Sequence, residues 1–202
     1  MQLMEFGIFL TTNRKKIMNK EMHQAEQGGL SLTPVIVEAQ AVETILVVID
    51  MQPGYPAALD AVTQWFVKQE IQKQMEQNLP VILVEFDAHE MGETLQSLRD
   101  LLAGYKRLKV VSKSQNDGST EVIAACRILT GYDTPFRLRV CGVNSDACVL
   151  ETVQGLSEKL PLTSIVVPQD ACNCLTGKEN DVWVEDFPAL LNVVVELHAR
   201  GS

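Results

Sequence analysis

The stretch RVCGVNSDACVLETV, residues 139–153, joins the end of an apolar strand to the start of a helix. After Arg139 it continues with the strand-like residues Val-Cys-Gly-Val, its central Asn-Ser-Asp is typical of a turn or helix cap, and Cys148 falls in the first helical turn. A helix N-terminus favours the ionised thiolate. Cys148 is therefore either a small buried core residue or a nucleophile with a lowered pKa.

Other short apolar runs along the chain resemble the one that leads into this turn. Near-continuous apolar strands are typical of a sheet that is covered on both faces. Segments with helical spacing separate them, which predicts right-handed crossovers. The sequence therefore predicts an α/β fold, a three-layer α/β/α sandwich around a six-stranded, mainly parallel, Rossmann-like sheet. The expected strands are residues 44–50, 80–87, 107–113, 137–143, 163–170 and 192–197.

Composition narrows the possible partners and compartment. The chain has 202 residues, of which 46% are hydrophobic, and a formal net charge of −9. No basic cluster with interleaved aromatics is present, which disfavours nucleic-acid binding, and no apolar run is long enough to span a membrane. Five cysteines are an odd number for a disulfide framework. We expect a cytoplasmic protein without a nucleic-acid or membrane partner.

The N-terminal part of the chain differs from the rest. Residues 1–38 contain no recognisable chemistry, and the alternation of strands and helices begins near residue 43. We therefore expect a poorly specified N-terminal extension over residues 1–38 and a single domain over residues 39–202.

Three chemical groups follow expected strands. Asp50 ends the first strand, Lys113 ends the third, and Cys148 follows the fourth. Alone, each has an ordinary explanation as a turn residue, a solvated cation or a buried thiol. Because ligand sites of parallel sheets lie at the carboxyl ends of the strands, the three are expected to meet. They would supply a general acid–base, a cation and a nucleophile.

Four motifs resemble those of the isochorismatase-like cysteine hydrolases. VVIDMQPGY (47–55) is similar to the first-strand D-M-Q-x-x-F motif, with Tyr55 at the aromatic position, and CGVNSDACV (141–149) is similar to the nucleophile turn. VVSK (110–113) resembles the lysine strand, and VVPQDACN (166–173) the fifth-strand ending. The resemblance covers roughly residues 43–197.

The resemblance implies specific roles. It gives Asp50, Lys113 and Cys148 as the catalytic triad, a cis peptide between Val143 and Asn144, and an oxyanion hole formed by the backbone N–H groups of Asn144 and Cys148. It also implies that the substrate lies against Tyr55, Val143, Asn144 and Ser145, although Tyr55 could instead cover the core.

The activity expected from this resemblance is cleavage of a C–N bond, in an amide or ureido small molecule, through a thioester. The alternative is a catalytically inactive protein that keeps the fold and binds a ligand or partner. A thiol-redox role for Cys172 and Cys174 is a weaker third possibility. The family further implies a homo-oligomer, a dimer or tetramer.

A metal is not expected. Asp87-x-His89 resembles the metal motif of nicotinamidases, but the other histidines, His23 and His198, lie near the chain ends. Catalytic zinc usually has three protein ligands, so we interpret His89 as a loop residue and predict no metal and no cofactor.

Two polar groups have open interpretations. The cluster Asn116-Asp117-Gly118-Ser119 is expected to cap the next helix, and could also donate hydrogen bonds to a substrate. Arg137 and Arg139 alternate with apolar residues, as ordinary exposed strand residues or as part of a subunit contact.

Overall fold

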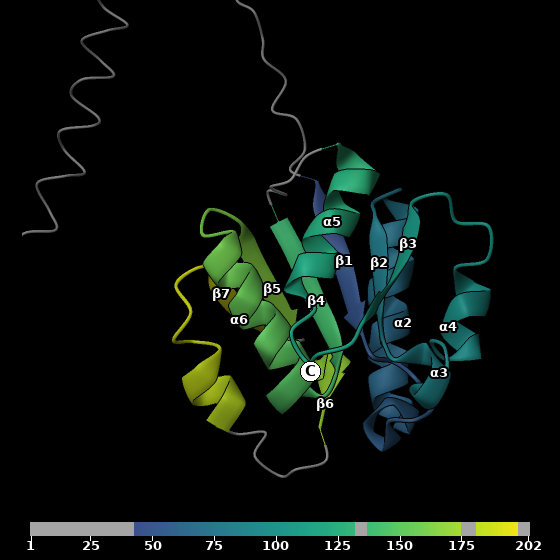
Figure 1. Cartoon of the computed structure of the whole chain (residues 1–202), viewed down its shortest axis with the longest axis horizontal. Coiled ribbons are helices and arrows are strands. Elements are labelled where there is room, and N and C mark those ends of the chain that lie inside the picture. The colour runs from purple at the N-terminus through teal and green to yellow at the C-terminus, as the bar shows by residue number, and fades with distance from the viewer. Residues whose placement is uncertain (1–42, 132–136, 175–180, 198–202) are drawn as a thin grey trace, which may run out of the picture. The chain divides into compact units, whose positions relative to one another are not determined.

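The computed structural model describes residues 43–131, 137–174 and 181–197. Strands and helices alternate through these ranges, as the apolar runs and the helical spacing predict (Figure 1). The predicted extension over residues 1–38 lies outside the described residues, so the boundary at residue 39 stays a prediction. None of the helices in the described ranges has the length and hydropathy that a bilayer crossing requires.

The sheet is parallel throughout, and each of the six predicted segments forms a strand. The strand order is β3-β2-β1-β4-β5-β7, with the two-residue β6 paired to the end of β4. A run as short as β6 has no periodicity, which is why the sequence does not predict it. The strands are β1 (Thr44–Ile49), β2 (Val81–Phe86), β3 (Leu108–Lys113), β4 (Arg137–Val143), β5 (Ser164–Pro168), β6 (Cys172–Asn173) and β7 (Val193–Glu196).

Helices cover both faces, which confirms the three-layer architecture. In Figure 1, α5 and α6 lie in front of the sheet and α2 lies behind it. The helices are η1 (Pro56–Leu59), α2 (Ala61–Glu76), α3 (Ala88–Met91), α4 (Gln96–Leu101), α5 (Ser119–Thr130), η2 (Ser145–Val149), α6 (Leu150–Lys159), η3 (Gln169–Ala171) and η4 (Val182–Asp186).

The core is centred on β1, between β2 and β4. Every residue from Ile45 to Ile49 is buried, because this strand has neighbours on both sides and helices on both faces. The edge strand β3 is covered less completely, and its Val110 is exposed. The short apolar runs therefore mark strands of both kinds, and only their position in the sheet decides burial.

Helix α2 begins later than the sequence pattern predicts. The apolar spacing favours one helix over residues 57–78, whereas the structure has η1, then Asp60 in an extended conformation, then α2. The Thr63 N–H donates to Asp60 Oδ2 at 2.7 Å, so Asp60 is the N-cap of α2. A residue in that role cannot lie inside a continuous helix.

Arg139 connects the sheet to α2. Its guanidinium pairs with both carboxylate oxygens of Glu70 on α2 and with Glu196 on β7. Glu70 is almost completely buried, and the Arg139 side chain is largely buried. The interpretation of Arg139 as an ordinary exposed strand residue is therefore wrong, whereas a subunit contact stays a prediction. Arg137, on the same strand, is exposed.

Candidate active site

The three predicted groups meet at the carboxyl ends of the strands. Asp50 follows β1, Lys113 ends β3, and Cys148 lies in η2 after β4. Strand β2 separates β1 from β3, and the Lys113 side chain reaches past it, with its Nζ 5.1 Å from the centre of the Phe86 ring. Lys113 Nζ is 2.9 Å from Asp50 Oδ2, and both side chains have no exposed surface.

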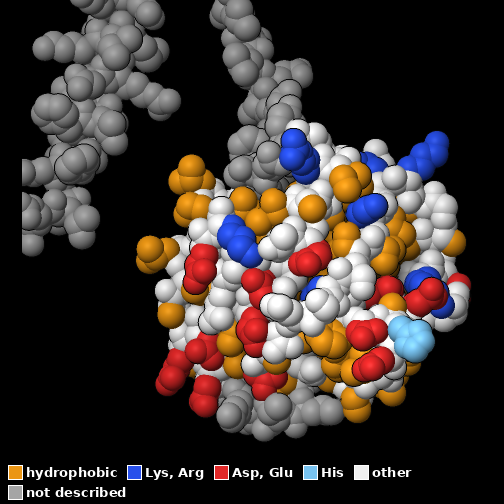
Figure 2. All heavy atoms as spheres, in the orientation of Figure 1, with side chains coloured by type: hydrophobic (Ala, Val, Ile, Leu, Met, Phe, Trp, Pro, Cys, Tyr) orange, Lys and Arg blue, Asp and Glu red, His pale blue; other side chains and the backbone are white. Residues whose placement is uncertain are grey.

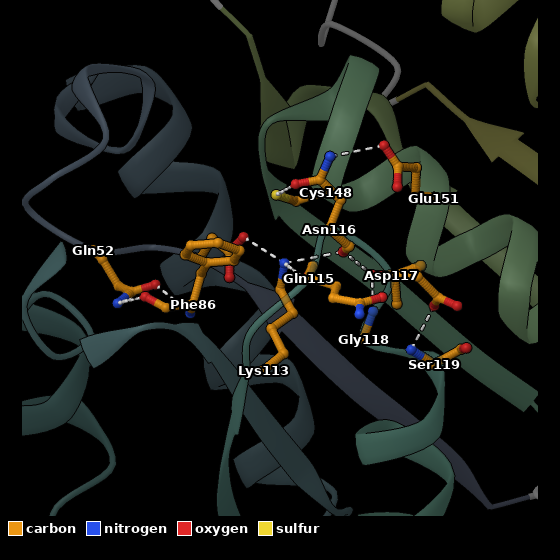
Figure 3. Close-up of polar contacts among 12 residues, drawn as sticks. Gln52, Phe86, Lys113, Gln115, Asn116, Asp117, Gly118, Ser119, Cys148 and Glu151 are labelled. Atoms are coloured by element: carbon orange, nitrogen blue, oxygen red, sulfur yellow. Dashed lines mark hydrogen bonds and ion pairs between the residues drawn. The ribbon is translucent and has the colours of Figure 1, made fainter. Parts of the chain in front are cut away.

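Two backbone carbonyls hold the Lys113 ammonium group from the other side. Nζ donates to the Gln115 oxygen at 3.1 Å and to the Asn116 oxygen at 3.0 Å (Figure 3). With Asp50, these contacts account for the three donors of the ammonium group. The cation is therefore fixed in place next to the carboxylate, which a buried charge requires.

Asp50 is held in an unusual environment for a carboxylate. Its backbone is left-handed, with φ of 50°, which turns the chain sharply at the end of β1. Among the described residues, neither carboxylate oxygen has a hydrogen bond of regular geometry, so the ion pair with Lys113 is the main compensation. Burial raises the pKa of Asp50, and the charge of Lys113 and the contact with Cys148 oppose that rise.

The environment of Cys148 is the opposite of the one expected from a helix N-terminus. The thiol is 3% exposed and lies in the π-helical turn η2, which precedes α6. Burial, and to a smaller extent Asp50, raise its pKa to about 12, although Lys113 opposes the rise. The predicted lowering of the pKa is therefore wrong, because desolvation and the neighbouring carboxylate outweigh the lysine.

The turn between β4 and η2 has a tightly constrained backbone. Its Val143–Asn144 peptide is cis, and the Asn144 carbonyl accepts hydrogen bonds from the N–H groups of Ala147 and Val149 at 3.1 and 3.0 Å. Gly142 has φ of +121°, and a Cβ there would lie 2.0 Å from the Ile49 oxygen. Only glycine permits this approach, which brings the turn beside the end of β1. The oxyanion hole stays a prediction.

The residues expected to contact the substrate differ in how deeply they are buried. Val143 and Ser145 are fully buried, whereas Tyr55 and Asn144 are half-buried. The Ser145 hydroxyl has no hydrogen-bond partner among the described residues. Burial and the charges of Asp50 and Cys148 raise the pKa of Tyr55, so its phenol lies near both groups. Their contact with a substrate stays a prediction.

Gln52 supports the site in a way that the sequence interpretation missed. Its side-chain amide donates to the carbonyls of Phe86 and Gly92, and its oxygen accepts from the Phe86 N–H at 2.8 Å. Gln52 therefore joins the loop after β1 to the end of β2 and to the turn after α3. Gln52 belongs to the D-M-Q motif, but the motif alone does not show that its side chain joins these two segments.

The cluster after Lys113 divides into two functions. The N-cap of α5 is Gly118, and Asp117, one residue before it, accepts the Ser119 N–H at 2.7 Å with its Oδ1, so the cluster does bind an N–H at the start of this helix as predicted. Asn116 instead points toward Cys148, whose thiol donates to its Oδ1 at 3.5 Å. Asparagine and aspartate are both common in turns and at helix starts, so the sequence alone could not show that Asn116 contacts Cys148 while Asp117 binds the helix N–H.

A cavity of about 470 Å³ opens beside Lys113 at this edge of the sheet. Of the described residues, those lining it include Asp87, His89, Lys113 and Glu121, but not Cys148. Within the described ranges, no three His, Cys, Asp or Glu side chains converge as metal ligands. Asp87 and His89 therefore have no third ligand of these types among the described residues, and the expectation that no metal binds stays a prediction.

Many solved structures match this chain, among them those of a nicotinamidase, an amidase and an isochorismatase family protein. The nicotinamidase from Staphylococcus aureus has a TM-score of 0.63 at 15% identity, over 77% of this chain and 99% of that one. The N-carbamoylsarcosine amidase from Thermoplasma acidophilum has a TM-score of 0.61 at 18% identity, over 79% and 99%. An isochorismatase family protein from Burkholderia thailandensis has a TM-score of 0.61 at 17% identity, over 77% and 92%.

The chain has the isochorismatase-like fold. The resemblance read from four short motifs is thus confirmed at the level of the fold. Neither a family model nor a curated protein matches the sequence. Sequence identities this low show a common fold and not a common reaction, because one fold supports many activities.

Proposed function

We propose that this protein is a cysteine hydrolase that cleaves a C–N bond, in an amide or ureido small molecule, through a thioester on Cys148. The observation that carries the proposal is the buried Asp50–Lys113 ion pair, placed against the Cys148 thiol. A buried charge pair is costly to maintain, and perturbed titratable groups cluster at functional sites. The names of the nicotinamidase and amidase neighbours support hydrolysis of this bond class.

In the first half of the reaction, the sulfur attacks the substrate carbonyl while Asp50 takes the thiol proton. The raised thiol pKa favours transfer during attack over a thiolate formed beforehand. The oxyanion would be stabilised by the N–H groups of Asn144 and Cys148. The C–N bond then breaks, Asp50 returns the proton to the leaving nitrogen, and a thioester remains.

In the second half, water attacks the thioester. Asp50, again a carboxylate, takes a proton from the water as the new C–O bond forms. The C–S bond breaks, the sulfur regains the proton, and the acid is released. Lys113 keeps Asp50 in place throughout and favours its ionised form, which is the form that accepts protons.

The surface around the site favours neutral or cationic substrates. On the face in Figure 2, acidic side chains gather over the lower half, where the strands of Figure 1 have their carboxyl ends. A negative surface lowers the local concentration of anions. We therefore expect small uncharged amides or ureido compounds to react in preference to their carboxylated analogues.

A second candidate function is ligand binding without turnover. The observation in its favour is that Cys148 is only 3% exposed and does not line the cavity beside Lys113. Such a protein would use the 470 Å³ cavity for binding and leave the thiol as a core residue. It would bind small amides and release no product.

The decisive experiment is a screen of small amides and ureido compounds for release of ammonia or amine, with and without a chelator. Cys148→Ala should abolish turnover of every substrate found, whereas Cys126→Ala, in the core of α5, should retain it. Equal activity of the two variants would overturn the proposal. Binding of an amide with no product from the wild-type protein would favour the second candidate.

Two further expectations concern the whole protein. We expect a homo-oligomer, a dimer or tetramer, which sedimentation of the full chain would measure. We also expect a cytoplasmic location and a small-molecule partner, with no nucleic acid and no membrane.

A further inference from the structure

Asn116 connects the proposed nucleophile to a surface carboxylate. Figure 3 shows its side-chain amide between Cys148 and Glu151. The Cys148 thiol donates to Asn116 Oδ1 at 3.5 Å, and Asn116 Nδ2 donates to Glu151 Oε1 at 2.8 Å. Glu151 lies in the first turn of α6, within one turn of Cys148 along the chain. The mechanism above assigns no role to either residue.

The carboxylate determines which way the amide points. An ionised glutamate only accepts hydrogen bonds, so the Asn116 amide must present its NH₂ group to Glu151. The carbonyl oxygen is then left facing the sulfur. The Asn116 backbone also anchors the site, because its carbonyl accepts from Lys113 Nζ at 3.0 Å and from the Thr152 hydroxyl at 3.2 Å.

We propose that Asn116 is a positioning residue that holds Cys148 in its protonated form between turnovers, and that Glu151 fixes the orientation it needs. The inference rests on the proposed function of Cys148. A carbonyl oxygen accepts from a thiol but repels a thiolate, so this orientation favours the neutral sulfur. Attack would then require the proton to move to Asp50, which couples ionisation of the thiol to the arrival of a substrate.

Other charged groups also face the sulfur and must be separated from this effect. Asp50 approaches from the end of β1, Lys113 from β3, and the Tyr55 phenol from the loop before η1. Glu151 is exposed, so its charge could also act on the sulfur directly through solvent. A direct effect would not need Asn116, and this difference makes the proposal testable.

The test is the rate of Cys148 alkylation by iodoacetamide, followed by peptide mass spectrometry at a series of alkaline pH values. Glu151→Gln keeps the shape of the side chain and lets the Asn116 amide turn its NH₂ group to the sulfur. A thiol pKa lower by one unit speeds alkylation about threefold at fixed pH, after allowing for reduced nucleophilicity. We expect a gain of this size in Glu151→Gln.

Two comparisons decide whether the gain passes through Asn116. In an Asn116→Ser background, Glu151→Gln should have no further effect, as a double-mutant cycle reports for coupled residues. Glu158→Gln removes the same charge from an exposed position on α6 and should leave the rate unchanged. An unchanged rate in Glu151→Gln, an equal gain in the Asn116→Ser background, or an equal gain in Glu158→Gln would overturn the proposal.

Two further measurements remove the remaining ambiguities. If Asn116→Ser does not fold, the alkylation rates of wild type and Glu151→Gln are compared at low and high salt instead. Added salt weakens a direct effect of the exposed Glu151 charge on the thiol, but not an effect that passes through hydrogen bonds. If iodoacetamide does not reach the thiol, thiolate absorbance is read against Cys148→Ala. Neither readout requires turnover, so a failure of the hydrolase proposal and a failure of the Asn116 proposal give different results.

Discussion

At the scale of single residues, the site combines an acid, a thiol and an ammonium group, all three of which are almost completely buried. Burial acts on Asp50 and Cys148 in the same direction and raises both pKa values. Each group is then a poor anion by itself, and one proton can move between them. This arrangement suits a general acid–base that receives a proton during attack and returns it to a leaving group.

Replacing Asp50 by asparagine separates thiol reactivity from turnover. The charge of the Asp50 carboxylate and its contact with the thiol raise the pKa of Cys148, whereas Lys113 lowers it. In Asp50→Asn, the pKa of Cys148 should therefore fall, and alkylation at a fixed alkaline pH should become faster. Turnover should nevertheless be lost, by a factor of about 100 or more, because the proton acceptor is gone.

The same protein sample contains a control for this prediction. Cys126 is buried in α5, and burial raises its pKa to about 12 without a contribution from Asp50. The alkylation rate of Cys126 should be the same in wild type and Asp50→Asn, both in the native and in the denatured protein. Slower alkylation of Cys148 in the variant would mean that the carboxylate does not act on the sulfur as described.

The sequence was sufficient to predict that these three side chains come together, but not whether each is charged. Asp50, Lys113 and Cys148 each follow an apolar run, and parallel topology brings strand ends together. The direction of the Cys148 pKa depends on how closely the loops cover it, and apolar patterning does not encode this. Asn116 was also indistinguishable from its capping neighbours until its side chain was placed.

At the scale of elements, the start of α2 depends on one carboxylate. Asp60 accepts from both the N–H and the hydroxyl of Thr63, at 2.7 and 2.8 Å. We expect Asp60→Ala to lower the free energy of unfolding by about 1 kcal/mol, measured by urea denaturation at neutral pH with an unchanged m-value. Asp60→Asn keeps a good cap and should lose less.

This prediction has a pH dependence of definite sign. The hydrogen bonds from Thr63 hold the pKa of Asp60 below its ordinary value in the folded protein. The stabilisation is therefore present above the unfolded-state pKa, about 3.9, and is lost as the pH falls through the folded-state value. The difference between wild type and Asp60→Ala should shrink in acid. A difference that grows in acid would show that the cap is not ionised.

At the scale of the whole molecule, the alternation of elements was sufficient to predict the layers and the parallel sheet. What the pattern could not supply are contacts between distant elements. The Arg139–Glu70 pair joins residues 69 apart in sequence, and the Gln52 side chain joins residues 34 and 40 apart. Both hold the loops and helices at fixed positions on the sheet, and the sequence around Arg139 or Gln52 does not show which distant residue each side chain contacts.

The Arg139 network predicts a stability difference between two arginines on the same strand. Arg139→Met would leave Glu70 buried without its guanidinium partner, and breaking a buried pair costs about 3 kcal/mol or more. Arg137→Met, at an exposed position, should stay within about 0.5 kcal/mol of wild type in urea denaturation. Arg139 pairs in register with Leu46, which lies four residues before Asp50 in the chain. Both arginines are therefore remote from the site, and alkylation of Cys148 should be unchanged in both variants. Equal stability of the two variants would mean that the network does not fasten α2 to the sheet, and that apolar contacts alone position it.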